Sequence, residues 1–323
     1  MSDRQTFSSE ISEMNEQGSS LWRDAMIRLS RNRASMASLV ILALIGAACF
    51  LIPLLPWLPN PNVQDLSRIA EGVSGDHWFG TDQLGRDLFA RVLYGGRISL
   101  LVGLVATGVS LVIGVAYGLV SGYAGGRLDA WMMRTVDVLF ALPFIVLVII
   151  FSLAIQEPSS QLTAWVTEVT GLSSETVAPM TGLIPLFIAI GALGWLTLAR
   201  IVRTQTMELK NQEFVEAARS LGLGHARILF FHIAPNLLGP VIVYTTLSVP
   251  GIMLLEAVLS FLGLGVKAPN SSWGTLIKEG ADRMEITPEL LLFPALFFSL
   301  TLLALNFLGD GLRDALDPRS SKD

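Results

Sequence analysis

The amino-acid sequence predicts an all-α membrane protein that crosses the bilayer six times. Of its 323 residues, 52% are hydrophobic and 15% are charged, whereas soluble domains carry about 25% charged residues. The apolar residues are concentrated in six long runs that are almost free of charge, and about 20 such residues in helical form cross a bilayer core. The predicted spans are 35–56, 98–120, 138–156, 181–199, 237–259 and 290–309.

The first 33 residues are polar and are predicted to form a cytoplasmic N-terminal segment. Between Leu21 and Leu29 the apolar side chains fall on one helical face, while Arg28 and Arg31 fall on the other. This pattern is typical of an interfacial helix on a membrane surface, and an ordinary solvated helix is the alternative. A secretory leader has a shorter apolar stretch before its cleavage site, so we expect the run from Ala34 to be retained as the first span.

The lysine and arginine residues predict the orientation of the spans. Cytoplasmic segments carry an excess of these residues, and 15 of the 22 fall on one side when both termini are cytoplasmic. Outer loops are then predicted at 57–97, 157–180 and 260–289, an inner loop at 200–236 and a cytoplasmic tail at 310–323, around a transmembrane domain at 34–309. The polar 157–180 segment contains Trp165 and Pro179 and fits an outer loop or an interfacial helix.

The second span carries small residues at every fourth position. They are Ser110, Gly114, Gly118 and Gly122. A stripe of small residues lets two helix backbones approach closely. We therefore predict a helix-packing seam, with a path for a solute as the alternative.

Signatures of common enzymes are missing. A phosphate-binding loop needs Gly-Lys followed by Ser or Thr, and none of the four lysines follows a glycine. Zinc-protease and G-x-S-x-G motifs are also missing, and the single cysteine, Cys49, provides no disulfide. We expect no catalytic residue, no metal site and no cofactor site in this chain.

The inner loop between the fourth and fifth spans is too long to be a simple connection. It is predicted to form two short amphipathic helices, 211–220 and 225–231, which are separated by Leu-Gly-Leu-Gly at 221–224. Gly222 and Gly224 permit positive φ and a sharp turn, and Pro235 suits the start of the next helix. A helix–turn–helix with one apolar side is suited to docking into a groove of another protein; a plain interfacial loop is the alternative.

This loop resembles the loop shared by the membrane permease subunits of ABC importers. It carries Glu-Ala-Ala at 216–218, then Gly222 four residues later and Pro235 thirteen residues beyond. His232 and Ala234 stand where the family consensus has Ile and Leu, and the sequence FHIAPN at 231–236 is similar instead to the peptide-importer branch.

Further motifs extend the resemblance over nearly the whole chain. They resemble the dipeptide, oligopeptide and nickel permeases, and most of all the C-type subunit of oligopeptide importers. The motifs are SLWRDA (20–25), FGTD (79–82), GRD (85–87), SFLGLG (260–265), SWG (272–274) and NFLGDGLRDALDP (306–318). The 157–180 segment is longer than that subunit usually has at this place.

The resemblance implies an alternating-access importer of the bacterial inner membrane. A periplasmic binding protein delivers a peptide to a heterodimer of homologous permease subunits, and two separate ABC ATPase subunits bind ATP and Mg²⁺. The resemblance also implies that Glu216 to Gly224 form the lever that the ATPases move. The implied coupling residues are Glu216, Ala217, Ala218, Arg219, Gly222 and Gly224. Glu216 and Arg219 are expected to make polar contacts, and the two alanines to allow close approach to the ATPase groove.

Glu256 is the one carboxylate near the interior of a predicted span. Ionisable groups inside a membrane are costly and are functional hypotheses by default. We take Glu256 as a candidate residue of the translocation path, or as a salt-bridge partner of the other permease subunit. The alternative is that the helix ends early and leaves Glu256 at the interface. Asn306 in the last span is expected to make a helix-packing hydrogen bond.

Alternatives within and outside the transporter class stay open. Importers of nickel, glutathione or muropeptides share these motifs and this machinery. A proton-coupled secondary transporter commonly has inverted repeats with broken helices and would need a buried acidic or histidine relay, for which the spans offer only Glu256. A membrane scaffold without transport activity would explain the spans but not the glycine-containing inner loop. Nothing in the charge pattern indicates a nucleic-acid partner.

Overall fold

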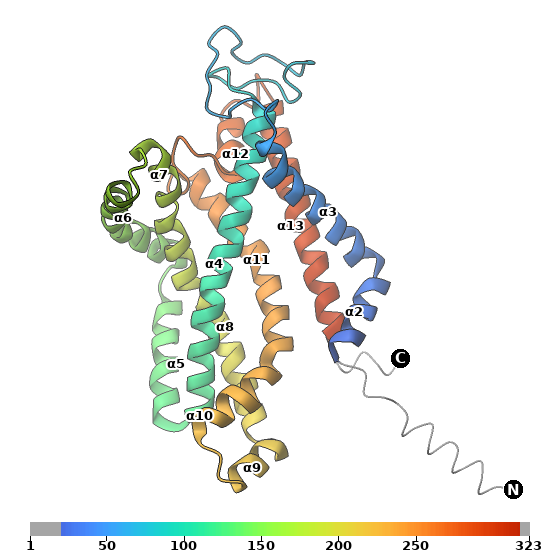
Figure 1. The fold of residues 1–323 in the computed structure, drawn as a ribbon, viewed down its shortest axis with the longest axis vertical. Coiled ribbons are helices and arrows are strands. Elements are labelled where there is room, and N and C mark those ends of the chain that lie inside the picture. Colours follow the sequence, from blue (N-terminus) through green and yellow to red (C-terminus); the bar gives the residue numbers. More distant parts are fainter. Residues whose placement is uncertain (1–20, 317–323) are drawn as a thin grey trace, which may run out of the picture.

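The computed structural model describes residues 21–316, and its long elements are all helical (Figure 1). Among these residues the isolated bridge between Thr81 and Asp87 is the only β pairing. Six helical segments are long and apolar enough to cross a membrane: Arg33–Leu54, Leu88–Ala124, Phe144–Thr170, Ile184–Lys210, His225–Phe261 and Glu289–Leu316. The prediction of an all-α, polytopic membrane protein is confirmed. The ends of the predicted N-terminal segment (1–20) and tail (317–323) lie outside the described residues.

Figure 1 labels these elements in chain order. The long helices are α3 (Arg33–Leu51), α4 (Leu88–Ala124), α6 (Phe144–Thr170), α8 (Ile184–Lys210), α11 (Leu238–Phe261) and α13 (Glu289–Leu316). The shorter helices are α2 (Leu21–Arg31), α5 (Gly126–Ala141), α7 (Ser174–Thr181), α9 (Glu213–Ser220), α10 (His225–Ile228) and α12 (Trp273–Ala281). The segment 55–87 caps the upper end of the bundle, whereas α9, α10, α2 and the end of α13 all lie toward the lower end. Both described ends of the chain therefore lie in the same half of the molecule as α9.

The glycine stripe of the second span packs α4 against α8. Ser110 donates a hydrogen bond of 3.0 Å to the carbonyl of Gly191. A Cβ atom at Gly118 would lie only 2.6 Å from the carbonyl oxygen of Ala199, and one at Gly122 only 2.6 Å from that of Arg203. These close approaches confirm the predicted packing seam.

The third predicted span, 138–156, is interrupted in the structure. Pro143 follows Leu142, which is extended (φ −86°, ψ 146°) and ends α5; the residue before a proline is disfavoured in the helical conformation. After this break α6 runs across the axis of the bundle and is seen nearly end-on in Figure 1, while α5 runs alongside the inner half of α4. The predicted span 138–156 was defined by its lack of charged residues, so it combined the end of α5 with the first part of α6.

The segment 157–180, predicted as an outer loop, is largely helical. It contains the second half of α6 and most of α7. The hydroxyl of Ser159 donates to the carbonyl of Thr181 (2.8 Å), and the hydroxyls of Thr163 and Thr181 lie 2.6 Å apart. The polar residues that suggested a solvated loop therefore bond the two helices to each other.

Two other helices, α4 and α13, extend beyond their predicted spans because they continue into polar and charged residues. Asp87 caps α4 by accepting a hydrogen bond from the amide of Ala90 (2.7 Å), so this helix begins inside the predicted outer loop 57–97. Helix α13 continues to Leu316, past the predicted end at 309. A charge-free run marks the apolar part of a helix, whereas the helix itself continues into its charged turns.

The FGTD and GRD motifs form an ionic cluster where the 55–87 segment meets α4 and α12. Arg91 is 3% exposed and donates to Asp82 (2.7 Å) and to both carboxylate oxygens of Glu279 (2.5 and 3.1 Å). Arg86 also donates to Asp82 (2.6 Å). Buried charges are tolerated when they are paired and hydrogen-bonded. This cluster holds the segment to the helical bundle.

Near the inner end, two ion pairs join α5 to α8. Arg203 donates two hydrogen bonds of 2.5 Å to the carboxylate of Asp129, whose exposure is 7%, and Ser121 donates a third. The hydrogen bonds from Arg203 hold the pKa of Asp129 below its usual range. The second pair is exposed to solvent, and in it Arg200 donates a hydrogen bond of 2.6 Å to the carboxylate of Asp137.

We expect Asp129→Asn to destabilise the protein by about 2 kcal/mol, because hydrogen bonds to charged groups contribute roughly 1.5–3 kcal/mol. The matched variant Asp137→Asn should cost at most about 1 kcal/mol, since exposed pairs contribute little. Because the pKa of Asp129 is lowered on folding, its contribution is present at neutral pH. It is lost as the pH falls below the ordinary aspartate range toward the depressed pKa. Thermal unfolding in detergent at several pH values measures this, and equal effects of the two variants would contradict it.

Candidate functional site at the inner end of the bundle

Helix α9 and the turn that follows it form the part of the inner loop that projects farthest from the bundle (Figure 1). Gln212 precedes α9 in an extended conformation (φ −80°, ψ 149°). Glu213 and Glu216 lie in its first turn and Arg219 in its last, which is the charge order that the helix dipole favours.

One face of α9 belongs to the core of this subunit. Val215 is fully buried and Ala218 is 4% exposed. They pack in one cluster with residues of α4, α8 and the segment that leads into α11, among them Leu119, Val202 and Ile228. The predicted role of Ala218 in approaching an ATPase groove therefore does not fit the structure. Residues three apart share a helix face, so Ala218 faces inward with Val215.

The rest of the α9 surface is exposed. Glu216, Ala217 and Arg219 are exposed there, as predicted for contact residues. Sequence reasoning missed two apolar residues on this surface, Phe214 (41% exposed) and Leu221 (81% exposed). Phe214 precedes Ala217 by three residues and Leu221 follows it by four, so helical periodicity alone could have placed all three on one face. We call Phe214, Ala217 and Leu221 the outer stripe of α9.

Gly222 makes the turn after α9. Its φ is +77°, and the amide of Leu223 donates to the carbonyl of Ala218 (3.2 Å) while the amide of Gly222 donates to that of Arg219 (2.9 Å). This pair of bonds is the Schellman motif, which places a residue in the left-handed conformation after the last turn of a helix. The sharp turn predicted at Gly222 is present.

Gly224 has a different conformation from the one predicted. Its φ is −68° and its ψ 154°, an extended conformation that any residue adopts, and it precedes α10. The second helix of the loop also does not end at residue 231. It passes through a π-helical turn (Leu229–Ile233) and a 3-10 turn (Ala234–Leu237) directly into α11. Pro235 lacks an N–H and its ring would clash with the carbonyl four residues earlier in an α-helix, which explains the widened turn before it.

Arg219 lines a cationic notch beside the turn. The notch has a volume of about 530 Å³, and its other lining residues are Tyr123, Ala124, Lys210 and His225. The ammonium of Lys210 donates to the carbonyl of Tyr123 (2.5 Å), and the Tyr123 hydroxyl lies 2.9 Å from Nδ1 of His225. These bonds connect the end of α4 to the end of α8 and to the start of α10, so the walls of the notch are held in place. Its positive charges suit an acidic side chain.

Glu256 lies in a different environment from the one predicted. Its side chain is fully buried within α11 and accepts hydrogen bonds from Ser260 (2.6 Å) and Ser99 (3.2 Å). The amide of Trp273, at the start of α12, donates to the same Ser99 hydroxyl (3.1 Å). The carboxyl group therefore joins α11, α4 and α12 and is enclosed by residues of this subunit. Asn306 donates to the carbonyl of Leu302 within its own helix (2.8 Å).

Comparisons with known proteins show the family of this chain. Residues 114–322 match the family described as binding-protein-dependent transport system inner membrane component, and residues 20–70 match the N-terminal transmembrane domain of oligopeptide transport permease C. The first match alone covers more than half of the chain. The chain belongs to this permease family.

Individual permeases are similar over almost their full length. The oligopeptide transport system permease protein OppC of Haemophilus influenzae is 46% identical, across 96% of this chain and 92% of its own. OppC of Escherichia coli is 43% identical, across 94% of this chain and 93% of its own. The dipeptide transport system permease protein DppC of Bacillus subtilis is 42% identical, across 92% of this chain and 85% of its own. The permease is thus a multi-pass inner-membrane protein with a role in transport rather than catalysis.

Proposed function

We propose that this permease pairs with a homologous membrane subunit to form the translocation path of an ATP-driven peptide importer. In this proposal a periplasmic binding protein delivers the peptide, and two separate ABC ATPases drive its movement. The observation that carries the proposal is the outer stripe of α9, which is exposed on a helix whose other face is locked into the subunit's own core. An apolar helix face of this kind is suited to a groove of another protein.

The residues around the stripe suit the same contact. Glu216 and Arg219 offer one charge of each sign beside it, and Gly222 fixes the direction of α9. The cationic notch beside Arg219 would receive an acidic side chain of the ATPase. Ala218 and Gly224 act indirectly, since one packs inward and the other connects the turn to α10.

ATP and Mg²⁺ belong to the ATPase subunits in this proposal, and the permease itself catalyses no reaction. ATP can favour one state of the importer only through its differential affinity for that state. A closed ATPase dimer that binds ATP more tightly would push α9, and the permease would change the side on which its path is open.

Peptides are the substrate class that the relatives support. The relatives named above are oligopeptide and dipeptide permeases. Nickel, glutathione and muropeptides remain the alternatives for the same machinery, and mass spectrometry of the ligand that copurifies with the cognate binding protein separates them.

Reconstitution tests the proposal. The chain alone in liposomes should neither hydrolyse ATP nor take up peptide. The partner permease, the ATPases, the binding protein and ATP should together produce uptake, and the ATPases should copurify with the complex. The deciding control supplies a proton or sodium gradient without ATP. Uptake through this chain alone under that gradient would establish the secondary transporter instead.

A further inference from the structure

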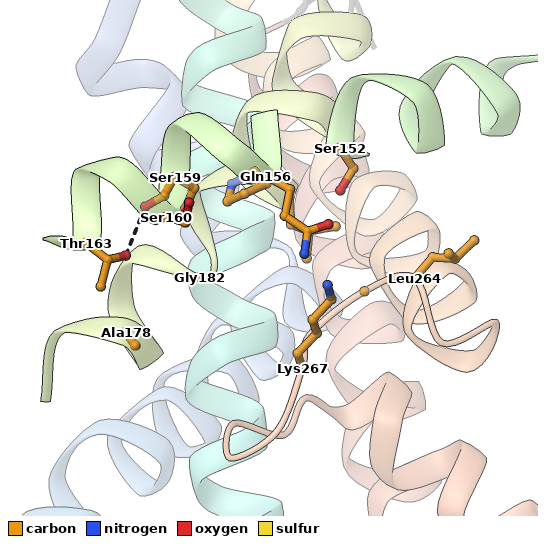
Figure 2. A pocket seen from close by; sticks show the side chains of 12 residues that line it. Ser152, Gln156, Ser159, Ser160, Thr163, Ala178, Gly182, Leu264 and Lys267 are labelled. Atoms are coloured by element: carbon orange, nitrogen blue, oxygen red, sulfur yellow. Dashed lines mark hydrogen bonds between the residues drawn. The ribbon is translucent and has the colours of Figure 1, made fainter. Parts of the chain in front are cut away.

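A polar groove with no assigned role lies between α6, the start of α8 and the chain that follows α11 (Figure 2). It consists of a cavity of about 220 Å³ and a neighbouring cavity of about 120 Å³. The two cavities share Ser152, Gln156, Leu264 and Lys267. In the proposed orientation α6, α7 and this groove lie toward the outer side, from which an imported solute arrives.

The groove contains one positive charge and no negative charge. Lys267 is the only charged residue that lines either cavity. The side chains of Lys267, Gln156 and Ser152 have no hydrogen bond or ion pair to any described residue. Figure 2 shows Gln156 and Lys267 pointing toward one another across the groove. An ammonium offers three donors and no acceptor, and a carboxamide adds two donors, so these side chains together suit an anionic group with two oxygen atoms.

The wall opposite Lys267 is held in place by its own hydrogen bonds. Thr163 donates to the carbonyl of Ser159 (2.9 Å), and both residues bond to Thr181 at the end of α7. The hydroxyl groups of this wall are therefore fixed before any ligand arrives. Fixed polar groups lower the ordering cost of binding.

The smaller cavity beside this polar region is apolar. Apart from the shared residues, its lining is Val148, Ile149, Leu153, Leu259 and Gly263. A ligand that fills both cavities would carry an anionic group next to an apolar one. The volumes are small compared with the roughly 300–1,000 Å³ of pockets that enclose a whole ligand, so the groove fits one end of a longer molecule.

We infer that this groove binds the carboxyl-terminal end of the peptide, with Lys267 and Gln156 donating to its carboxylate and the apolar cavity receiving its last side chain. This inference rests on the proposed function, because it takes the solute to be a peptide. A phospholipid head group is the competing anion, but the apolar cavity of about 120 Å³ has the volume for one side chain and not for a whole acyl chain.

The test uses the assembled importer in liposomes, saturated with loaded binding protein, and two forms of one peptide that ends in leucine. One form has a free carboxyl terminus and the other a carboxyl-terminal amide. Wild type should transport the free acid faster. Lys267→Gln should slow the free acid about tenfold, the size expected for loss of one charge-assisted hydrogen bond, and should leave the amide rate unchanged. Gln156→Leu should produce a smaller loss of the same kind.

Lys278→Gln is the matched control, because Lys278 lies on α12 nearby and lines neither cavity; it should change neither rate. Equal slowing of both peptides by Lys267→Gln, or no slowing, would overturn the inference and leave the importer function standing. Slowing that depends on the fraction of anionic phospholipid would assign the groove to a lipid head group and overturn the inference as well. If wild type transports neither peptide, the proposed function fails and the inference fails with it.

Discussion

Gly222→Val is expected to abolish the stimulation of ATP hydrolysis by loaded binding protein while leaving the permease folded in the membrane. Gly222 has φ +77°, and a β-branched residue is a genuine outlier in that conformation. An L-residue there costs about 1–2 kcal/mol, so the turn would relax and α9 would leave its orientation. Nothing lies within 4 Å of the position of a new Cβ atom, so the bundle itself meets no clash. The measurement is ATPase activity of the purified complex, with and without loaded binding protein.

Gly224→Val is the matched control for this prediction. Gly224 lies two residues away, and an added Cβ atom there would also have no neighbour within 4 Å. Its backbone is extended, a conformation that valine adopts readily. It adds the same side chain without backbone strain, so stimulated hydrolysis should be retained. Normal stimulation in Gly222→Val, or an equal loss in both variants, would show that the left-handed turn does not direct α9.

Gly118→Val should have the largest effect on stability. Its Cβ would lie 2.6 Å from the carbonyl oxygen of Ala199, 2.7 Å from Cβ of Val202 and 2.9 Å from the amide nitrogen of Arg203. Two of these atoms are backbone, so α4 and α8 would have to separate. Overpacking typically costs 1–3 kcal/mol and occasionally more, and we expect about 3 kcal/mol here because the seam runs along both helices. The fall in unfolding temperature in detergent measures it.

Gly108→Val separates packing from helix propensity. Gly108 lies in the same helix, and no atom lies within 4 Å of its added Cβ. The substitution should therefore be neutral or slightly stabilising, since valine is a better helix former than glycine. A similar loss in both variants would mean that the seam tolerates a larger residue and that the glycines are not required for it.

The spans could be predicted from the sequence because a bilayer constrains the chain so strongly. Backbone polar groups inside the membrane must bond within helices or closed barrels, so long apolar runs predict helices directly. The direction of α6 was harder to predict from the sequence. The Leu142–Pro143 pair is a visible break signal, but a count of charges ignores it. The orientation of the termini stays a prediction, although the described ends of the chain and α9 share one half of the molecule.

The contact face of α9 and the environment of Glu256 depend on tertiary structure. Val215 and Phe214 are both apolar, and sequence cannot tell which one packs into the subunit's own core and which one faces outward. The partners of Glu256 are equally hidden, because Ser99 lies 157 residues away in the sequence. A lone carboxylate in an apolar run suggests a functional site, whereas here neighbouring hydroxyl groups satisfy it.

Helical turns continue without a gap from α10 through the π turn and the 3-10 turn into α11, so the 37 residues from His225 to Phe261 form one helical segment, which contains Pro235 and Pro250. At about 1.5 Å per residue the path along this segment is roughly 55 Å. The far end is anchored through Glu256 and Ser99 to α4 and the start of α12. We therefore expect a displacement of α9 to pass along this segment toward the opposite end of the bundle, because helical turns connect the two ends without a gap.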